Sequence, residues 1–355
     1  ANARAFGGQD YTGYHTFMAL VPAYRMAGEL SADRQALPVL KVLYRNSSRI
    51  QEQQAGQRDT LHHVHAAEPV EPGRGGELLR EAVRAVDRNA AEARFAAIAE
   101  GPANEAFNQL LLAVQDEVNV HRVVLAWRAW AMLELAGEQY AHTFLRQSVQ
   151  FCVDSEQTMR DHKHPTPEVR ATLPRLLDEY RLLTKPLGTR PAEDASAQEL
   201  AQAIFSGTRD QAAEAAAAAL ADGMDPEAVG EAISMAANLL VLHDPGRREQ
   251  YSTPQKPPGC VHGDSTGVHA SDAANAWRNI ARVSNSRNAA ASLIVGAYHT
   301  AGQFGAVNKD PYPYMGLLEE VDSQNEQTLL GQAEEAIRGR DQARACAVVH
   351  RYGEL

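Results

Sequence analysis

The chain has 355 residues, of which 44% are hydrophobic and 22% charged, so it can build a core for one large domain or two ordinary ones without disulfides. No run of about 18 apolar residues occurs, which excludes a membrane-spanning helix and predicts a soluble protein. With 34 basic and 45 acidic residues the net charge is -11, so the molecule repels phosphate backbones and nucleic acid is not expected as a partner.

The three cysteines, Cys152, Cys260 and Cys346, are few and lack Cys-x-x-Cys spacing. Neither a disulfide framework nor a thiolate metal site is therefore expected. The small residues at positions 1–3 are typical of the stretch that remains near a processing site. Export to the periplasm is thus one expectation, and a cytoplasmic location is the other.

Apolar residues recur with helical spacing in nearly every segment that is not rich in proline and glycine, which predicts an all-α multi-helix bundle. In the first half we expect helices at residues 11–27, 38–54, 76–89, 103–118, 121–135, 138–159 and 167–184. Gly137 separates two of them and predicts an antiparallel helix hairpin. A loop at residues 56–75 carries several histidines.

Residues 185–191 contain two prolines and a glycine and predict a boundary between two helical halves, 1–184 and 192–355. We expect the halves to pack as one compact domain with the functional site between them. The second half is expected to contain helices at 211–221, 226–242, 271–284 and 287–303, followed by two polar helices. Residues 243–268 lack helical periodicity, and a loop of this length inside a compact domain is usually functional.

The thirteen histidines are informative because imidazole is the commonest metal ligand in proteins and the commonest general base near neutral pH. His15, His142 and His299 each occupy an apolar face of a predicted helix. A single histidine in such a place is more often a hydrogen-bonded core residue. His121 follows Glu117 by one helical turn, and this pair either binds an ion or forms a hydrogen bond.

The long loop ends in a segment that can take part in metal binding. His262 and His269 flank Asp264 between two glycines, and Asp264 is a candidate ligand or a partner that orients one. Without a metal, the same segment is a capped loop that enters the next helix. In the earlier loop, a His-His-x-His pattern begins at His62 and can either chelate an ion or remain solvated.

A faint internal repeat relates two of these regions. A Val-His pair precedes an Ala-Trp-Arg triplet twice, once with His121 and Trp127 and once with His269 and Trp277. The repeat suggests two helical hairpins whose histidines meet at the centre, although two short matches in an alanine-rich chain can also arise by chance.

The joint pattern of histidines carries more weight than any one of them. Burial of an unpartnered imidazole costs about 1–3 kcal/mol, so several imidazoles on inward faces need a shared partner. A metal ion is the simplest such partner, and nitrogen ligands favour iron, copper or zinc over magnesium or calcium. The sequence has no metalloprotease helix, no paired Glu-x-x-His motif of di-iron bundles, no phosphate-binding loop and no Gly-x-Ser-x-Gly.

Two stretches resemble the questin oxidase-like family. Residues 15–27 look like that family's N-terminal motif, in which a histidine precedes an apolar run that closes with an aromatic residue and an arginine. Residues 260–266 are similar to a later segment of the family, and the helix of His299 corresponds to its closing apolar helix. The family's middle histidine-rich motif is replaced here around His121 and His142. The resemblance implies an all-helical oxygenase with a multi-histidine non-haem iron centre and polycyclic aromatic substrates, and the departure in the middle puts the substrate class in question more than the metal.

We therefore expect a metal-dependent oxidoreductase or oxygenase that acts on a small organic substrate, with iron preferred to copper or zinc. The expected metal ligands are His15, His62, His121, His142, His262 and His299. Two carboxylates, Glu117 and Asp264, are expected to orient the rings or to take a proton. The residues expected to contact the substrate are Tyr24, Trp127, Arg128 and Trp277. A catalytic centre keeps a coordination position open, so some of the six histidines would support the ion indirectly.

Three alternatives remain. A hydrolase or lyase would use the ion to activate water, a helical scaffold would bind no metal, and a haem protein would use two opposed histidines. Lys41 is a separate case because its sequence neighbours are apolar. A buried Lys41 would have a lowered pKa and could form a carbamate with carbon dioxide, whereas its long side chain can also reach solvent.

Overall fold

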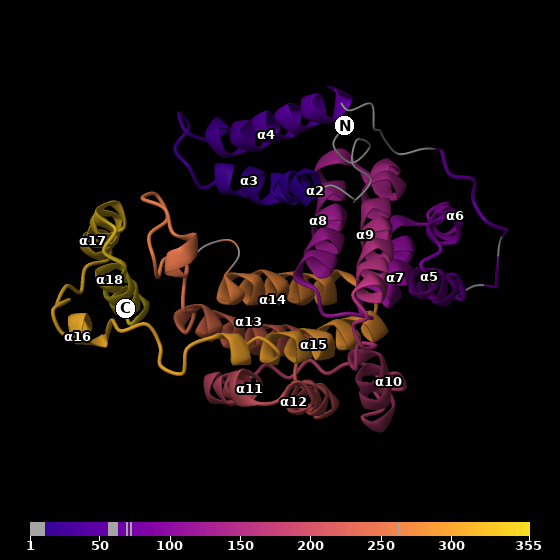
Figure 1. Cartoon of the computed structure of the whole chain (residues 1–355). Coiled ribbons are helices and arrows are strands. Elements are labelled where there is room, and N and C mark those ends of the chain that lie inside the picture. Colours follow the sequence, from indigo (N-terminus) through magenta and orange to yellow (C-terminus); the bar gives the residue numbers. More distant parts are fainter. Residues whose placement is uncertain (1–10, 56–62, 69, 72, 262, 264) are drawn as a thin grey trace. The chain divides into compact units, whose positions relative to one another are not determined.

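The computed structural model describes residues 11–355 except 56–62, 69, 72, 262 and 264. Within this part of the chain, helices account for the regular structure, and extended pairing is limited to two isolated backbone bridges. Figure 1 shows a bundle of helices without a sheet in the described residues. The predicted all-α fold class is confirmed.

The helices follow one another with short connections in most of the chain. Those before the first long proline-rich connection are α2 (Tyr11–Met18), α3 (Leu20–Ala27), α4 (Ala36–Ala55), α5 (Gly75–Ala85), α6 (Arg88–Ile98), α7 (Ala103–Val114), α8 (Val120–Ala136), α9 (Ala141–Asp161) and α10 (Val169–Glu179). Those after it are α11 (Asp194–Ser206), α12 (Arg209–Ala221), α13 (Pro226–Leu242), α14 (Thr266–Val283), α15 (Ser286–Ala301), α16 (Met315–Leu318), α17 (Glu326–Gly339) and α18 (Gln342–Gly353).

Helices α6 and α11 are not among the helices predicted from the sequence. The predicted helix over 76–89 ends at Ala85, and α6 begins at Arg88. Val86 turns the chain with a left-handed φ of 60°, and the side chain of Asp87 then accepts a hydrogen bond from the backbone N–H of Ala90. This aspartate caps α6. No glycine or proline marks the break, so the spacing of apolar residues alone does not reveal it.

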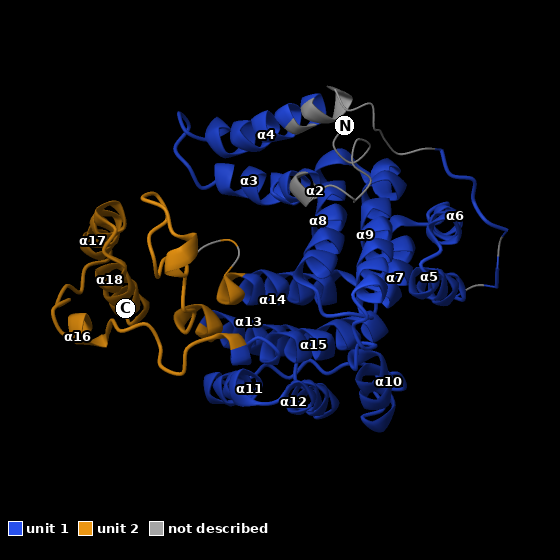
Figure 2. Ribbon diagram, in the orientation of Figure 1, with its two compact units in different colours: residues 1–238, 269–305 blue, residues 239–268, 306–355 orange. Residues whose placement is uncertain are grey.

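The chain forms two compact units (Figure 2). The first contains residues 1–238 and 269–305, and the second contains residues 239–268 and 306–355. The segment at 185–191, where a boundary was expected, therefore lies inside the first unit. The reason is local pairing: the backbone of Arg190 bonds to Gly223 and Asp225, and a side chain on Gly188 would lie 2.0 Å from the carbonyl oxygen of Gly223.

In the first unit, α8 and α9 form the predicted hairpin and lie side by side (Figure 1). Gly137 makes the corner with a φ of 96°, a conformation that side-chain-bearing residues rarely adopt. Aromatic side chains fill the core beneath these helices, among them the fully buried Phe95, Phe107 and Trp277. Burial of such large side chains is the main force that holds the helices together.

A chain of ion pairs links α7, α8, α9 and α10 inside the first unit. Arg122, whose side chain is fully buried, donates to the carbonyl oxygen of Ala113 at 2.6 Å and to the carboxylates of Glu117 at 2.7 Å and Glu156 at 3.3 Å. Arg170 also bonds Glu156, at 2.5 Å. Buried charges are tolerated when each is paired in this way, so the arrangement fixes how the four helices meet.

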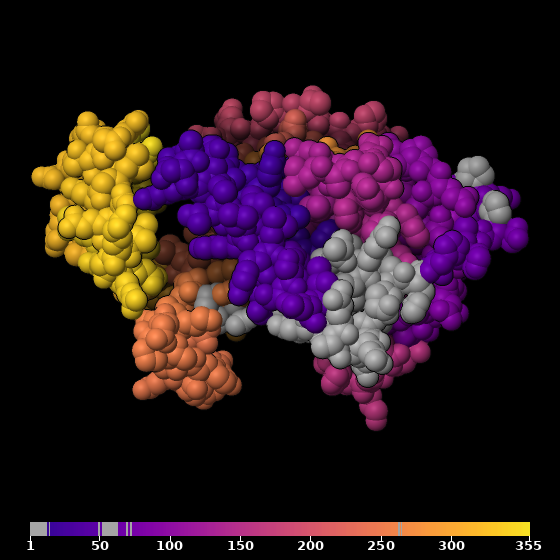
Figure 3. Space-filling model, turned by 90° about the horizontal axis from the view of Figure 1, so that it is seen from above, coloured from indigo at the N-terminus to yellow at the C-terminus, as the bar shows by residue number. Residues whose placement is uncertain are grey.

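The N-terminal helices α2–α4 contribute the indigo surface in Figure 3. Lys41 is exposed on α4, so it is not the buried amine that carbamate formation requires. Tyr24 on α3 is 55% exposed. Neither side chain is therefore in a protected site in this structure.

The second unit has its own small core. Val321, Leu329, Ala347 and Val348 are buried against one another where α17 and α18 meet. A groove of about 1070 Å³ runs between these helices and the connection at 255–263, and Cys260 is among the residues that line it. The long loop predicted at 243–268 thus supplies one wall of this unit.

Candidate functional site

Three histidines from distant parts of the sequence come together in the first unit. The Nε2 atoms of His15 and His121 are 3.1 Å apart, and their ring centroids are 4.8 Å apart. The ring of His269 lies 5.7 Å from that of His121, edge to face. We call His15, His121 and His269 the histidine cluster.

Local structure fixes the position of each ring. His15 lies in the middle of the short helix α2. His121 lies in the first turn of α8, where the Asn119 side chain accepts a hydrogen bond from its backbone N–H at 2.9 Å. His269 lies in the first turn of α14. Two of the three imidazoles therefore project from the first turns of helices, and in α8 the backbone there is held by the Asn119 cap.

A charged pair borders the histidine cluster. Arg128 follows His121 by two helical turns on α8, and Asp272 follows His269 by one turn on α14. A terminal guanidinium nitrogen of Arg128 lies 3.7 Å from Oδ1 of Asp272. Partial burial raises the pKa of Asp272, while the charges of Arg128, His269 and His15 oppose that rise. These two side chains thus share one electrostatic environment with the histidines.

His299 lies elsewhere in the core. It is 3% exposed, and the indole N–H of Trp277 donates a hydrogen bond to its Nδ1 at 3.3 Å. Burial, reinforced by the charges of Arg209 and His269, lowers the pKa of His299 to about 3. Trp277 and His299 therefore satisfy one another as a neutral pair, which is the ordinary role of a core histidine.

This pair predicts a pH dependence of stability. An unfolded histidine has a pKa of about 6.5, so below that pH the unfolded chain takes up a proton at His299 that the folded chain does not accept until about pH 3. The free energy of unfolding should fall with decreasing pH in this window, by up to about 1.4 kcal/mol per pH unit from this residue. Urea titrations at pH 7, 6, 5 and 4, followed by tryptophan fluorescence, measure the slope. His299→Gln should have a shallower slope, and equal slopes would contradict the assignment.

His142 belongs to a different environment again. Its ring stacks on Phe95 at 6.0 Å between centroids, and its Nε2 is buried without a hydrogen-bond partner among the described residues. Burial, together with the charges of Arg146 and His63, lowers the pKa of His142. His63 in turn contacts His65 at 4.8 Å. His142 therefore lies towards the loop histidines rather than in the histidine cluster.

Other predicted site residues are distributed as follows. Glu117 accepts hydrogen bonds from Arg122 and from the hydroxyl of Ser155, so its carboxylate is used in the ion-pair chain. Trp127 is buried on a face of α8 away from His121, and its indole N–H has no partner in the described part of the chain. His62, His262 and Asp264 lie outside the described residues.

Two residues at the site were not selected from the sequence. The sequence indicates His269 only as a residue beside the long loop and as a member of the Val-His repeat, and it does not indicate Asp272. Their spacing, His-x-x-Asp in the first turns of a helix, places both on one face. The Val-His repeat was the stronger signal, because it pairs His269 with His121 and these two rings do meet.

The metal-binding capacity of the site rests on two donors. No group of three or more His, Cys, Asp or Glu side chains among the described residues is arranged to hold one ion. His15 and His121, however, hold their Nε2 atoms 3.1 Å apart. Adjacent nitrogen ligands on one ion, each about 2.0–2.1 Å from it, are separated by about 3 Å. A direct hydrogen bond between the two rings would hold their Nε2 atoms at the same separation.

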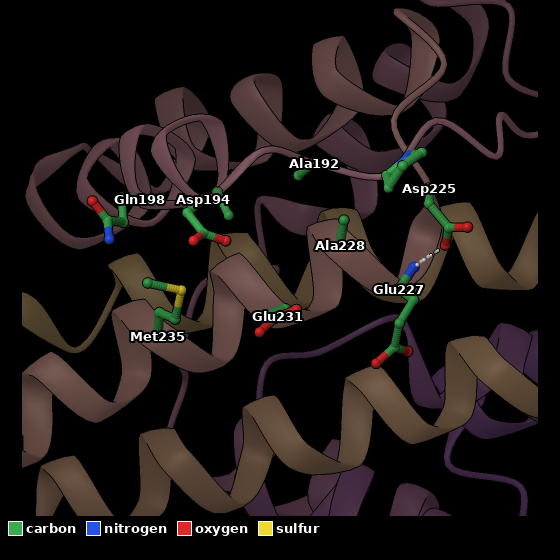
Figure 4. Close-up of a pocket in the computed structure, with 10 residues that line it drawn as sticks. Ala192, Asp194, Gln198, Asp225, Glu227, Ala228, Glu231 and Met235 are labelled. Atoms are coloured by element: carbon green, nitrogen blue, oxygen red, sulfur yellow. Dashed lines mark hydrogen bonds between the residues drawn. The ribbon is translucent and has the colours of Figure 1, made fainter. Parts of the chain in front are cut away.

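A separate cavity of about 480 Å³ lies between α11 and α13 (Figure 4). Four carboxylates, those of Asp194, Asp225, Glu227 and Glu231, are among its lining groups. Asp225 accepts a hydrogen bond from the backbone N–H of Glu227 at 2.7 Å, and Glu227 is paired with two arginines of α14. Half of these carboxylates thus have structural roles, and no histidine lines the cavity.

A scan against protein-family models, a search of curated proteins and a search of solved structures each found no match to this chain. The resemblance to questin oxidase-like proteins therefore stays a prediction. None of the helices in the described part of the chain combines the length and hydrophobicity needed to cross a membrane.

Proposed function

We propose that His15 and His121 hold a transition-metal ion and that the protein is a metal-dependent oxidoreductase for a small organic substrate, with non-haem iron as the expected ion. The observation that carries the proposal is the 3.1 Å separation of the two Nε2 atoms. They come from helices 106 residues apart in sequence, so no local turn geometry forces them together. The resemblance to questin oxidase-like proteins supports the choice of iron and of an aromatic substrate.

Among the described residues two nitrogens are placed to hold the ion, and this number suits a catalytic ion better than a structural one. A structural site surrounds its ion with protein ligands, whereas a catalytic site leaves positions for substrate and water. The ring of His269, 5.7 Å from that of His121, is the nearest further imidazole in the cluster. Bound iron would supply redox chemistry with dioxygen. The protein's own contribution is to position the substrate and to limit the access of water.

The side chains around the cluster fit that role. The ring of Phe151 lies 6.3 Å from His121 and provides an apolar wall. Arg128 on α8 and Asp272 on α14 provide polar groups beside the cluster. An apolar wall with a few oriented polar groups is the usual composition of a small-molecule site.

A haem is a poorer occupant of the same histidines. The two axial nitrogens of a bis-histidine haem lie on opposite sides of the iron, about 4 Å apart, with the porphyrin between the rings. The separation of 3.1 Å is closer to that of two ligands on one small ion than to this arrangement. A single non-haem ion is therefore favoured over a haem.

The test is reconstitution of metal-free protein. Iron(II) is added under nitrogen, excess metal is removed by dialysis, and bound iron is counted by elemental analysis. About one ion per chain is expected, followed by oxygen uptake on addition of hydroxylated polycyclic aromatic compounds, tested with and without a carboxylate substituent. Activity of a zinc form that is indifferent to oxygen would instead support a hydrolase or lyase. Absence of any stoichiometric transition metal would overturn the proposal in favour of a non-catalytic helical protein with a hydrogen-bonded histidine pair.

A further inference from the structure

The guanidinium of Arg128 has hydrogen-bonding capacity that the described residues do not use. Its closest carboxylate oxygen, Oδ1 of Asp272, lies 3.7 Å away, which is beyond hydrogen-bond distance. No hydrogen bond joins Arg128 to another residue in the described part of the chain. The side chain is nevertheless only 15% exposed. An arginine with this little exposed area normally uses most of its five N–H donors within the fold, so the donors of Arg128 are available to an acceptor that replaces water.

Two other arginines of the first unit, the fully buried Arg122 and the 34% exposed Arg84, show the contrast. Arg122 donates to a carbonyl oxygen and to two carboxylates. Arg84 binds both carboxylate oxygens of Asp116, at 2.5 and 2.7 Å. These side chains are bonded within the fold. Arg128 differs because its one acidic neighbour is loosely placed and itself 44% exposed.

The position of Arg128 relates it to the histidine cluster. Seven residues separate it from His121 on α8, which is about two turns or roughly 10 Å along the helix axis and nearly the same face. Asp272 lies within electrostatic range of Arg128, His269 and His15. A ligand held at Arg128 would therefore extend past Asp272 towards the imidazoles, over a length close to that of a substituted aromatic acid.

We propose that Arg128 binds a carboxylate of the substrate, so that the substrates of this site are organic acids, aromatic ones in particular. The reaction that such a substrate undergoes rests on the proposed function. The binding of a carboxylate at Arg128 does not. The planar guanidinium fork matches the two oxygens of a carboxylate. A phosphate, with more negative charge, would meet only one cation and an adjacent Asp272, in a protein of net charge -11.

The experiment compares benzoate with benzamide, its neutral counterpart of the same shape. Binding of each is measured by calorimetry to metal-free and to iron-loaded protein. Wild-type protein is expected to bind benzoate at least about tenfold more tightly than benzamide, and Arg128→Gln should abolish that preference. The iron-loaded protein should bind benzoate more tightly still, because the ion adds positive charge beside the imidazoles.

The matched control is Arg25→Gln. Arg25 carries the same charge and acts on Arg128 through space, but it is bonded to Glu134 at 2.8 Å and its side chain is 50% exposed. This variant should keep the preference for benzoate. If Arg25→Gln lost the preference for benzoate as fully as Arg128→Gln, the preference would come from the positive charge of the region and not from contact with Arg128. That result would overturn the inference. Circular dichroism confirms that each variant is folded.

Asp272→Asn keeps the inference testable if Arg128→Gln does not fold. Removal of the neighbouring negative charge should strengthen benzoate binding about threefold or more, and unchanged or weaker binding would contradict a carboxylate at Arg128.

Tighter binding of phenyl phosphate than of benzoate would also overturn the inference. Iron binding without benzoate binding would refute this inference alone, whereas benzoate binding through Arg128 in a protein that takes up no metal would refute only the proposed function.

Discussion

His121→Ala protein is expected to lose stoichiometric metal while it keeps its fold. His121 supplies one of the two nitrogens proposed to hold the ion, so its removal should weaken metal binding by at least about 100-fold. The capping bond from Asn119 uses the backbone N–H of residue 121, and alanine retains that group. The start of α8 should therefore survive the substitution. Equilibrium dialysis against iron(II) and zinc(II), with elemental analysis, measures the loss.

Two controls make this result specific to the cluster. His164→Ala removes an exposed imidazole and should leave the metal content unchanged. His299→Gln removes a histidine that the sequence places among the ligands but that the structure pairs with Trp277, and it too should retain the metal. Undiminished binding in His121→Ala, or a loss in His299→Gln as large as that in His121→Ala, would contradict the assignment of the ion to His15 and His121.

The contrast between His121 and His299 shows how far sequence reasoning reaches for this site. Periodicity correctly indicates that His299 lies on a buried apolar face, whereas the face of His121 also carries Glu117 and Arg128 and this imidazole is only partly buried. Periodicity does not indicate which inward faces meet. His15 and His121 meet because α2 packs on α8, whereas His299 meets Trp277 on the neighbouring helix α14. The four predicted histidine ligands in the described part of the chain, His15, His121, His142 and His299, therefore lie in three environments.

The fold, like the site, can be predicted from the sequence only where it depends on local residues. Helical spacing predicts the all-α class and the corner at Gly137, both of which depend on local sequence. The break before α6 depends on Val86 in a left-handed conformation, which the residue type disfavours and the surrounding packing imposes. The second unit is assembled from residues 239–268 and 306–355, with most of α14 and all of α15 between them in sequence. Such pairing of distant segments has no local signature.

The largest loss of stability is expected from Arg122→Ala. Its side chain is fully buried, and without it the carboxylates of Glu117 and Glu156 lose a cation that lies 2.7 and 3.3 Å away. Breaking a buried pair from one side leaves an uncompensated charge and costs about 3–5 kcal/mol. The carbonyl oxygen of Ala113 also loses its bond from the guanidinium. We expect the free energy of unfolding of the first unit to fall by about that amount.

Tryptophan fluorescence isolates this effect, because all three tryptophans, Trp127, Trp130 and Trp277, lie in the first unit. A urea titration followed at this signal therefore reports that unit without a contribution from the second. The control is Arg175→Ala, which breaks an ion pair with Glu179 whose side chains are 43% and 51% exposed, and it should cost less than about 1 kcal/mol. A similar small cost for Arg122→Ala would mean that the two carboxylates find other partners, and that the ion-pair chain does not determine how α7, α8, α9 and α10 pack. A large cost would identify Arg122 as the residue that orients α8, and hence His121, towards the remainder of the site.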